Sequence, residues 1–183
     1  MFFLETPRLL LVAMPAAVVT LRLTSNRFVA PVPTAVDGDG RPALPPAHVS
    51  FTPEWPGEAI ASFPELQRRH AADPAYQEWG GIMIDRERLI AVGQMGVKAP
   101  PDQTGTVEIG YGVNQSLRGR GYATELARAF ATWLLEQPSV RQVTAECLVD
   151  NHASARVLQT AGFRRAGERS DDEGILLLWE RVT

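Results

Sequence analysis

The sequence has little cysteine and histidine and no long apolar run. Its one cysteine, Cys147, excludes a framework of intrachain disulfides. His48, His70 and His152 stand far apart and lack metal-ligand spacing, so we predict no zinc or other metal. No stretch approaches the length of a membrane span, and the first residues lack the basic region of a signal peptide. We therefore expect a cytoplasmic protein without a membrane partner.

An excess of positive charge is also absent. The formal net charge is −3, which gives no electrostatic footprint for nucleic acid, and we predict no nucleic-acid partner. The composition is 45% hydrophobic and 21% charged, as in ordinary globular proteins. A chain of 183 residues is long enough to bury a substantial core without disulfides. We predict a single domain over residues 1–183.

The most informative stretch runs from Val107 to Ala123. It begins as a β-rich run and passes through a polar turn into the segment Arg118-Gly-Arg-Gly-Tyr-Ala. Apolar residues then recur at helical spacing, which predicts an amphipathic helix. The order is strand, glycine-rich loop, helix.

This loop has the properties of an anion site. A helix N-terminus presents unpaired N–H groups and the positive end of its dipole, and Gly119 and Gly121 let an anion approach the backbone closely. Arg118 and Arg120 add positive charge. A Walker loop would need Gly-Lys-Ser/Thr, and a Rossmann fingerprint would need Gly or Ala where Thr124 stands, so both are disfavoured.

The first half of the chain is less regular. Arg8 to Ala13 reads as a strand and Ala16 to Leu23 as a short helix. The Pro- and Gly-rich segment Phe28 to Ser50 predicts a long surface loop, which is either on the substrate side of a site or a mobile insertion. A helix is expected to begin with Thr52 as N-cap, to continue through Ile60, and to resume after an interruption at Pro64 as Glu65 to His70.

The second half alternates strands with helices. A hairpin of two strands precedes the strand that begins at Val107, and further strands and a short helix follow the amphipathic helix. The expected elements are strands at Trp79 to Asp85, Leu89 to Val97, Val140 to Asp150, from Phe163 onward and at Ile175 to Arg181, and a helix at His152 to Ala161.

Two motifs resemble those of a known family. Arg118, Gly121 and Tyr122-Ala123 fill the coenzyme A loop pattern of the GNAT superfamily of N-acetyltransferases. Asn151-His-Ala-Ser154, continuing through Leu158 to Gly162-Phe163, resembles its second signature in the form typical of the RimJ/RimL-like branch. The resemblance implies a mixed α/β GNAT-like fold. Its central twisted sheet of about six to seven strands would be splayed between the fourth and fifth strands and flanked by helices.

The same resemblance implies where acetyl-CoA, the cosubstrate, would bind. Gly110 and Gly112 indicate a bulge or a close backbone approach. In the family, such a bulge opens a gap in which strand backbone binds the pantetheine arm. The implied coenzyme-binding residues are Ile109, Tyr111, Val113, Arg118, Gly119, Arg120, Gly121, Tyr122, Ala123 and Asn151.

Acetyl transfer to an amine needs a base for the amine and a proton source for the leaving thiolate. By resemblance, Glu108 is the candidate base, with Glu146 as the second candidate. The alternative for Glu108 is a solvated or ion-paired strand carboxylate without a catalytic role. Asn151 is a candidate for catalysis and for capping a helix, with capping favoured, and it could contact the coenzyme in either role. Ser154 would assist the thiol or support that cap.

One position departs from the family pattern. Many family members carry a general-acid tyrosine seven residues after this asparagine, where this chain has Leu158. The proton must then come from Ser154, water, Tyr111 or Tyr122, or the thiolate leaves without one.

The resemblance implies an enzyme that acetylates a primary amine, with a protein N-terminal α-amine as the first candidate acceptor. The alternatives are a small-molecule amine, such as a polyamine, amino acid or antibiotic, and a non-catalytic acyl-CoA sensor. Exposed strand edges and the late hairpin are compatible with a homodimer.

Overall fold

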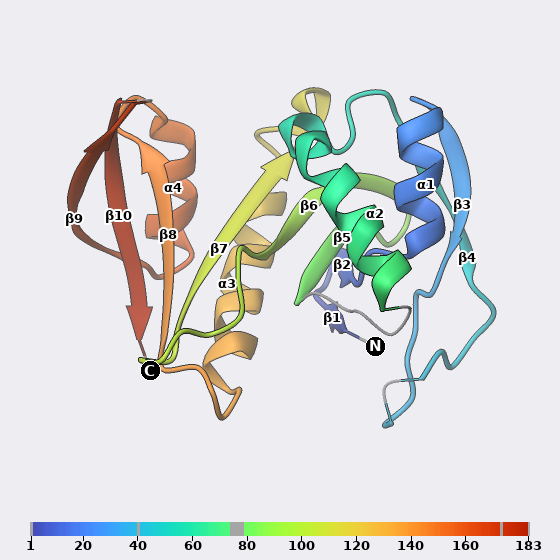
Figure 1. The fold of residues 1–183 in the computed structure, drawn as a ribbon, viewed down its shortest axis with the longest axis horizontal. Coiled ribbons are helices and arrows are strands. Elements are labelled where there is room, and N and C mark those ends of the chain that lie inside the picture. The colour runs from blue at the N-terminus through green and yellow to red at the C-terminus, as the bar shows by residue number, and fades with distance from the viewer. Residues whose placement is uncertain (1, 40, 74–78, 173, 183) are drawn as a thin grey trace. The chain divides into compact units, whose positions relative to one another are not determined.

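The computed structural model describes residues 2–39, 41–73, 79–172 and 174–182 (Figure 1). The chain divides into two compact units. Unit 1 comprises residues 1–96 and 111–120, and unit 2 comprises residues 97–110 and 121–183. Strand β7 (Thr106–Val113) contributes residues to both units. That the chain folds as a single domain stays a prediction.

Unit 1 is built on an antiparallel sheet. Strand β1 (Phe3–Glu5) pairs with β2 (Leu9–Val12), β2 with β5 (Gly80–Asp85), and β5 with β6 (Ile90–Val97). Strands β2 and β5 are buried along their whole length. The strand predicted at residues 8–13 and the hairpin predicted over residues 79–97 are therefore confirmed.

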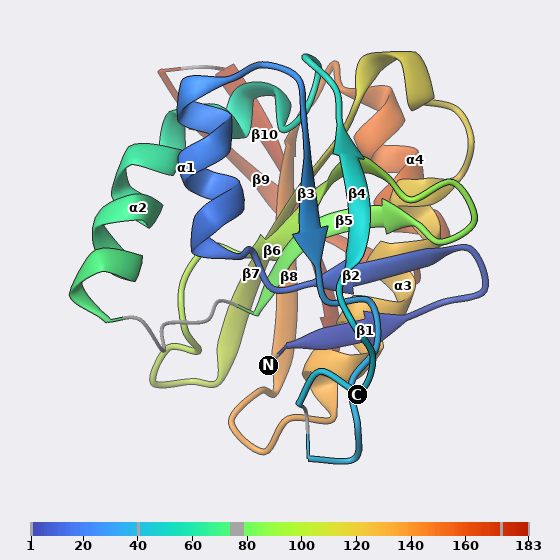
Figure 2. The same cartoon turned by 90° about the vertical axis from the view of Figure 1, so that its right-hand side faces the viewer.

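Helices and a second hairpin complete unit 1. Helix α1 (Ala16–Thr24) lies beside α2 (Phe63–Ala72), which follows the 3₁₀ helix η1 (Gly57–Ser62), as Figures 1 and 2 show. Aromatic rings fill the core between these elements. The ring centroids of Phe51 and Trp55 are 4.7 Å apart, and those of Trp55 and Phe63 are 5.6 Å apart.

Two predictions in this region were wrong. The segment Phe28 to Ser50 is not one long loop, because β3 (Phe28–Val32) and β4 (Ala47–Phe51) form a hairpin within it. Along β3, exposed Val29 and Pro31 alternate with buried Ala30 and Val32. Proline is tolerated in an edge strand, so Pro31 does not break β3. Its presence made the alternation of exposed and buried residues hard to recognise in the sequence.

The helix expected from Thr52 to Ile60 is also absent from the described residues, where a turn precedes η1 instead. Its expected continuation at Glu65 to His70 lies within α2 and is confirmed. Pro64 lies in the first turn of α2 and does not interrupt a helix. A first-turn residue needs no intrahelical N–H donor, so proline suits the start of a helix.

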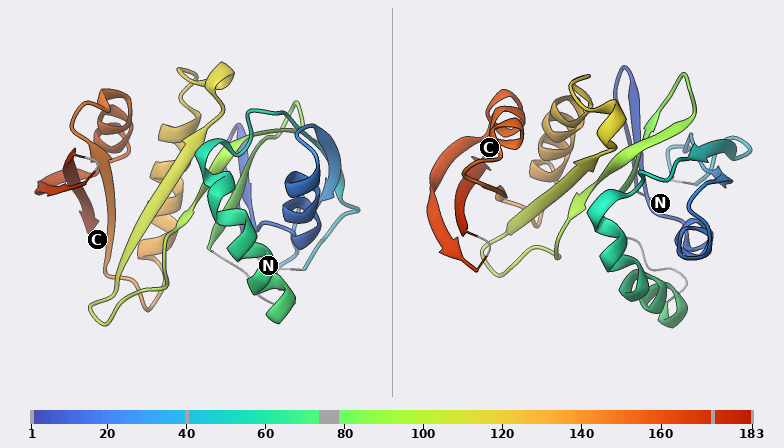
Figure 3. Two further views of the ribbon diagram at one scale, coloured as in Figure 1. Left: turned by 45° about the horizontal axis from the view of Figure 1, so that its top comes forward. Right: turned by 90° about the horizontal axis from the view of Figure 1, so that it is seen from above.

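Unit 2 combines a three-stranded antiparallel sheet with part of β7. Strand β10 (Gly174–Val182) pairs with β8 (Gln142–Leu148) on one side and β9 (Arg164–Asp171) on the other. Helices α3 (Tyr122–Leu135) and α4 (His152–Thr160) pack beside each other and against β8 (Figure 3). These elements confirm the predictions for the second half of the chain.

The parallel pairing of β7 with β8 is short. Among the described residues it covers three pairs, from Thr106↔Gln142 to Glu108↔Thr144, although β8 continues to Leu148. The splay expected between these two strands stays a prediction.

The expected fold class, a mixed α/β fold with a central mixed sheet flanked by helices, is confirmed. Ten strands are present among the described residues, more than the six or seven expected, because β1, β3 and β4 were not foreseen. No helix in the described ranges is both long enough and apolar enough to cross a membrane.

Candidate functional site

The glycine loop, residues 118–123, joins the 3₁₀ helix η2 (Gln115–Leu117) to α3. Gly119 and Gly121 have φ angles of 75° and 78°, a left-handed conformation that favours glycine. No heavy atom lies within 4 Å of the position where a Cβ on Gly119 would stand. The backbone therefore has open space beside it at Gly119.

The loop ends at the N-terminus of α3. Gly121 is the N-cap residue, and in the described part of the chain no side chain caps it. The first acidic residue of α3 is Glu125, and its backbone N–H donates to the carbonyl of Gly121 at 3.0 Å. A 14-residue helix with its positive dipole end open in this way favours an anion.

Arginines lie at the unit 1 end of the loop. Nε of Arg118 donates to the carbonyl of Val113 at 3.2 Å, which folds this side chain back along β7. Nη1 of Arg8 donates to the carbonyl of Arg120 at 3.0 Å. Sequence reasoning missed Arg8, because it lies 112 positions before Arg120 and belongs to no motif.

Glu54 anchors the turn that precedes the loop. Its carboxylate accepts hydrogen bonds from the backbone N–H and the hydroxyl of Ser116, both at 2.9 Å. The backbone hydrogen bond from Ser116, followed by its hydroxyl, lowers the pKa of Glu54. This side chain was also not foreseen, because the contact joins segments far apart in the sequence.

The glycines of β7 have separate roles. The carbonyl oxygen of Gly112 lies 2.1 Å from where a Cβ on Gly93 would stand, so the close approach is to β6 within unit 1. Gly110 lies in unit 2 beside the side chain of Lys98. Ile109 is buried, and Tyr111 and Val113 are half-buried.

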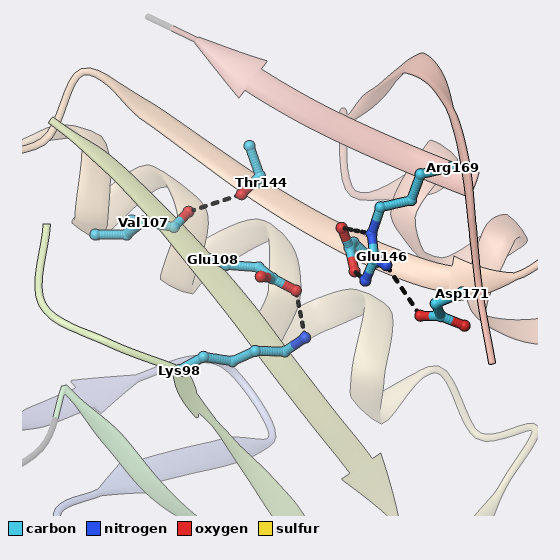
Figure 4. A network of polar contacts seen from close by, with 7 residues as sticks. All are labelled: Lys98, Val107, Glu108, Thr144, Glu146, Arg169 and Asp171. Carbon is cyan, nitrogen blue, oxygen red and sulfur yellow. Dashed lines mark hydrogen bonds and ion pairs between the residues drawn. The ribbon is translucent and has the colours of Figure 1, made fainter. Parts of the chain in front are cut away.

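Glu108 lies on the half-exposed face of β7, between buried Val107 and Ile109. Its carboxylate forms an ion pair with Nζ of Lys98, as Figure 4 shows. The backbone N–H of Lys98 also donates to the carbonyl of Glu108 at 2.8 Å. The ion-paired strand carboxylate, the alternative left open by the sequence, is therefore present, and the base role of Glu108 stays a prediction.

Glu146 is held more firmly than Glu108. The guanidinium of Arg169 binds both of its carboxylate oxygens, at 2.9 and 2.6 Å, and contacts Asp171 at 2.9 Å (Figure 4). The hydrogen bonds from Arg169 lower the pKa of Glu146. A carboxylate with a lowered pKa is a weaker proton acceptor, which argues against Glu146 as the candidate base.

Asn151 has the predicted capping role. Its Oδ1 accepts the backbone N–H of Ser154 at 3.0 Å at the start of α4. Leu158, at the position where many relatives carry tyrosine, is fully buried. Cys147 is buried in β8, as expected for a small apolar residue.

The structure divides the predicted site residues between the units. Unit 2 contains Glu108, Ile109, Gly121, Tyr122, Ala123, Asn151 and Ser154, and unit 1 contains Tyr111, Val113, Arg118, Gly119 and Arg120. Within the described ranges, no group of three or more His, Cys, Asp or Glu side chains could hold a metal ion.

Comparisons with known proteins bear on this site. A model of the acetyltransferase (GNAT) domain family matches residues 45–164. An uncharacterised N-acetyltransferase of Bacillus subtilis, YjdG, is 33% identical over 114 residues, which cover 60% of this chain and 67% of that protein.

Solved structures share the fold. RimL, a ribosomal-protein alpha-N-acetyltransferase in complex with coenzyme A, superposes with a TM-score of 0.64 at 16% identity, covering 98% of this chain and 97% of that one. An aminoglycoside acetyltransferase in complex with coenzyme A and kanamycin superposes with a TM-score of 0.54 at 18% identity, covering 68% and 79%. Enzymes of the matched family use acetyl-CoA as the acetyl donor. The chain belongs to the GNAT family of acetyltransferases.

Proposed function

We propose that this protein transfers an acetyl group from acetyl-CoA to a primary amine and binds the coenzyme's pyrophosphate at the glycine loop. The observation that carries the proposal is the N-terminus of α3, which begins at a left-handed glycine without a side-chain cap. Open space at Gly119 and the guanidinium groups of Arg118 and Arg120 supply room and charge for a diphosphate. The backbone of β7 at Ile109, Tyr111 and Val113 would bind the pantetheine arm.

The chemistry assigned to the residues is direct transfer between two bound substrates. Glu108 would take the proton from the acceptor ammonium, and Ser154 or water would return a proton to the thiolate. Buried Cys147 is unsuited to carry an acyl group, so we assign no covalent nucleophile. Positioning of the two substrates supplies much of the rate.

We propose a protein N-terminal α-amine as the acceptor, in the manner of the RimJ/RimL-like branch. Around Glu108, three carboxylates (Glu108, Glu146, Asp171) face two cations (Lys98, Arg169), which leaves one excess negative charge. One excess charge suits a monocation such as an N-terminal ammonium better than a polyamine. RimL, which shares the fold, is named for a ribosomal-protein substrate.

A small-molecule amine is the second candidate, because an aminoglycoside acetyltransferase shares the fold as well. Thiol release from acetyl-CoA, measured against N-terminal peptides, spermidine and kanamycin, separates the candidates. Turnover confined to the peptides supports the first proposal, and turnover confined to the small amines contradicts it.

The loop assignment is tested by Gly121→Val. A valine side chain at this position occupies the space proposed for the pyrophosphate, and calorimetric titration should show acetyl-CoA affinity lowered by roughly tenfold or more, about 1.4 kcal/mol. Gly162→Val is the matched control, because Gly162 also has a positive φ, 95°, but ends α4. If Gly121→Val binds as tightly as the control, the loop does not hold the coenzyme.

A further inference from the structure

The primary amine nearest the candidate base belongs to the protein itself. Lys98 is the only lysine in the sequence, and its Nζ forms an ion pair with Glu108 (Figure 4). The other permanently charged basic side chains are arginines. Arginine stays protonated at neutral pH and therefore does not accept an acetyl group.

Three contacts in unit 2 hold this amine. The backbone N–H of Lys98 donates to the carbonyl of Glu108 at 2.8 Å, which fixes the start of the side chain beside β7. Its stem crosses Gly110, where an added Cβ would lie 3.7 Å from Cε of Lys98. The ammonium then reaches the carboxylate of Glu108.

The amine is also accessible. The side chain of Lys98 is 55% exposed and that of Glu108 is 30% exposed. Glu146 carries a charge that interacts with Lys98, yet its oxygens are occupied by Arg169. Glu108 is therefore the carboxylate positioned to take a proton from Lys98.

We propose that Lys98 is a self-acetylation site, at which the protein transfers an acetyl group from acetyl-CoA to its own Nζ. The inference rests on the proposed function, because it uses the same donor and the same candidate base. An external acceptor must bring its ammonium to Glu108, and the ammonium of Lys98 is already at that carboxylate.

The reaction balances without a further reactant. Glu108 takes one proton from the Lys98 ammonium, and the neutral amine forms an N–C bond to the acetyl carbon while the C–S bond of the thioester breaks. The second proton of the attacking amine passes to the thiolate, and the proton on Glu108 is released to water, so the products are Nε-acetyl-Lys98, coenzyme A and one proton. Acetylation removes the charge of Lys98 and with it the ion pair to Glu108.

The test incubates the full-length protein with acetyl-CoA and maps acetylated peptides by mass spectrometry over time. We expect acetylation at Lys98 in the folded protein at a rate independent of protein concentration, as an intramolecular step requires. Glu108→Gln should slow it about a hundredfold, the lower range for loss of a general base. Lys98→Arg keeps a cation beside Glu108 and is the control in which the modification at residue 98 disappears.

Three outcomes would overturn the inference: no acetyl group on Lys98, a rate equal to that of the urea-unfolded protein, or a rate that rises in proportion to protein concentration. The same samples are assayed for thiol release with external amines and for acetyl-CoA binding. Turnover of an external amine without acetylation of Lys98 contradicts the inference and leaves the proposed function standing. Absence of acetyl-CoA binding contradicts the proposed function itself.

Discussion

At the scale of single residues, the ion pair between Glu108 and Lys98 is the feature most directly tied to chemistry. It keeps the carboxylate at a defined place on the half-exposed face of β7. The second carboxylate, Glu146, is bound at both oxygens by Arg169 and is less suited to accept a proton. The two side chains therefore differ in their contacts, although they stand on neighbouring strands.

Glu108→Gln tests the base assignment. The amide has nearly the same shape and cannot accept the amine proton, so turnover at neutral pH should fall about a hundredfold while acetyl-CoA affinity stays unchanged. Glu168→Gln is the control, because Glu168 pairs with Arg165 on exposed β9, away from the proposed chemistry. Full activity of Glu108→Gln across the pH range would show that another group is the base.

Some site residues could be predicted from the sequence and others could not. Gly119 and Gly121 were identified because a left-handed turn before a helix leaves a local pattern. Asn151 was identified as a cap for the same reason. Arg8 was not identified because its partner, Arg120, lies 112 positions away. Lys98 was not identified because it follows β6 while its partner Glu108 stands on β7, and no spacing rule links the two.

At the scale of elements, helix α4 depends on its N-cap. Asn151→Ala should lower the free energy of unfolding by about 1 kcal/mol, because the N–H of Ser154 loses its acceptor. Asn151→Asp keeps the oxygen and should restore stability, which thermal unfolding measures. If Asn151→Asp is stable but binds acetyl-CoA more weakly, the amide also contacts the coenzyme; unchanged stability of Asn151→Ala would contradict the cap.

The sheet of unit 2 is bridged by a second polar contact. Arg169 on β9 pairs with Glu146 on β8, so this ion pair links the two strands that flank β10. The folded-state pKa of Glu146 is lowered, so its ion pair stabilises the folded protein above the ordinary glutamate pKa, about 4.3. This stabilisation is lost as the pH falls through the lower folded-state pKa.

Glu146→Gln tests this contribution. The variant should unfold at a lower temperature than the wild type at pH 7, and the difference should shrink as the pH falls below the ordinary glutamate value. Thermal unfolding followed by circular dichroism across that range measures it. A difference that stays constant with pH would show that the charge of Glu146 does not stabilise the sheet.

The helices and strands that could be predicted were those in which buried apolar residues recur at regular spacing. The buried face of α3, formed by Leu126, Phe130 and Leu134 among others, repeats at helical spacing and was recognised. In β8, buried Val143, Ala145 and Cys147 alternate with half-exposed residues and were recognised too. Strand β3 was missed because Pro31 occupies an exposed position within its alternation.

At the scale of the whole molecule, the chain belongs to an acetyltransferase family whose match spans residues 45–164. That range contains both sequence motifs from which the resemblance was recognised. The strands that were not foreseen lie before or near its start. Strand β1 has three residues, too few to establish a period, and β3 and β4 are set within a Pro- and Gly-rich segment.

The central claim is that this protein binds acetyl-CoA and passes its acetyl group to an amine. The most direct test is calorimetric titration of acetyl-CoA into the wild-type protein, followed in the same sample by thiol release in the presence of N-terminal peptides. We predict binding and peptide-dependent release of coenzyme A, both weakened in Gly121→Val. Binding without release on any amine would contradict the transfer reaction, and absence of binding would contradict the site.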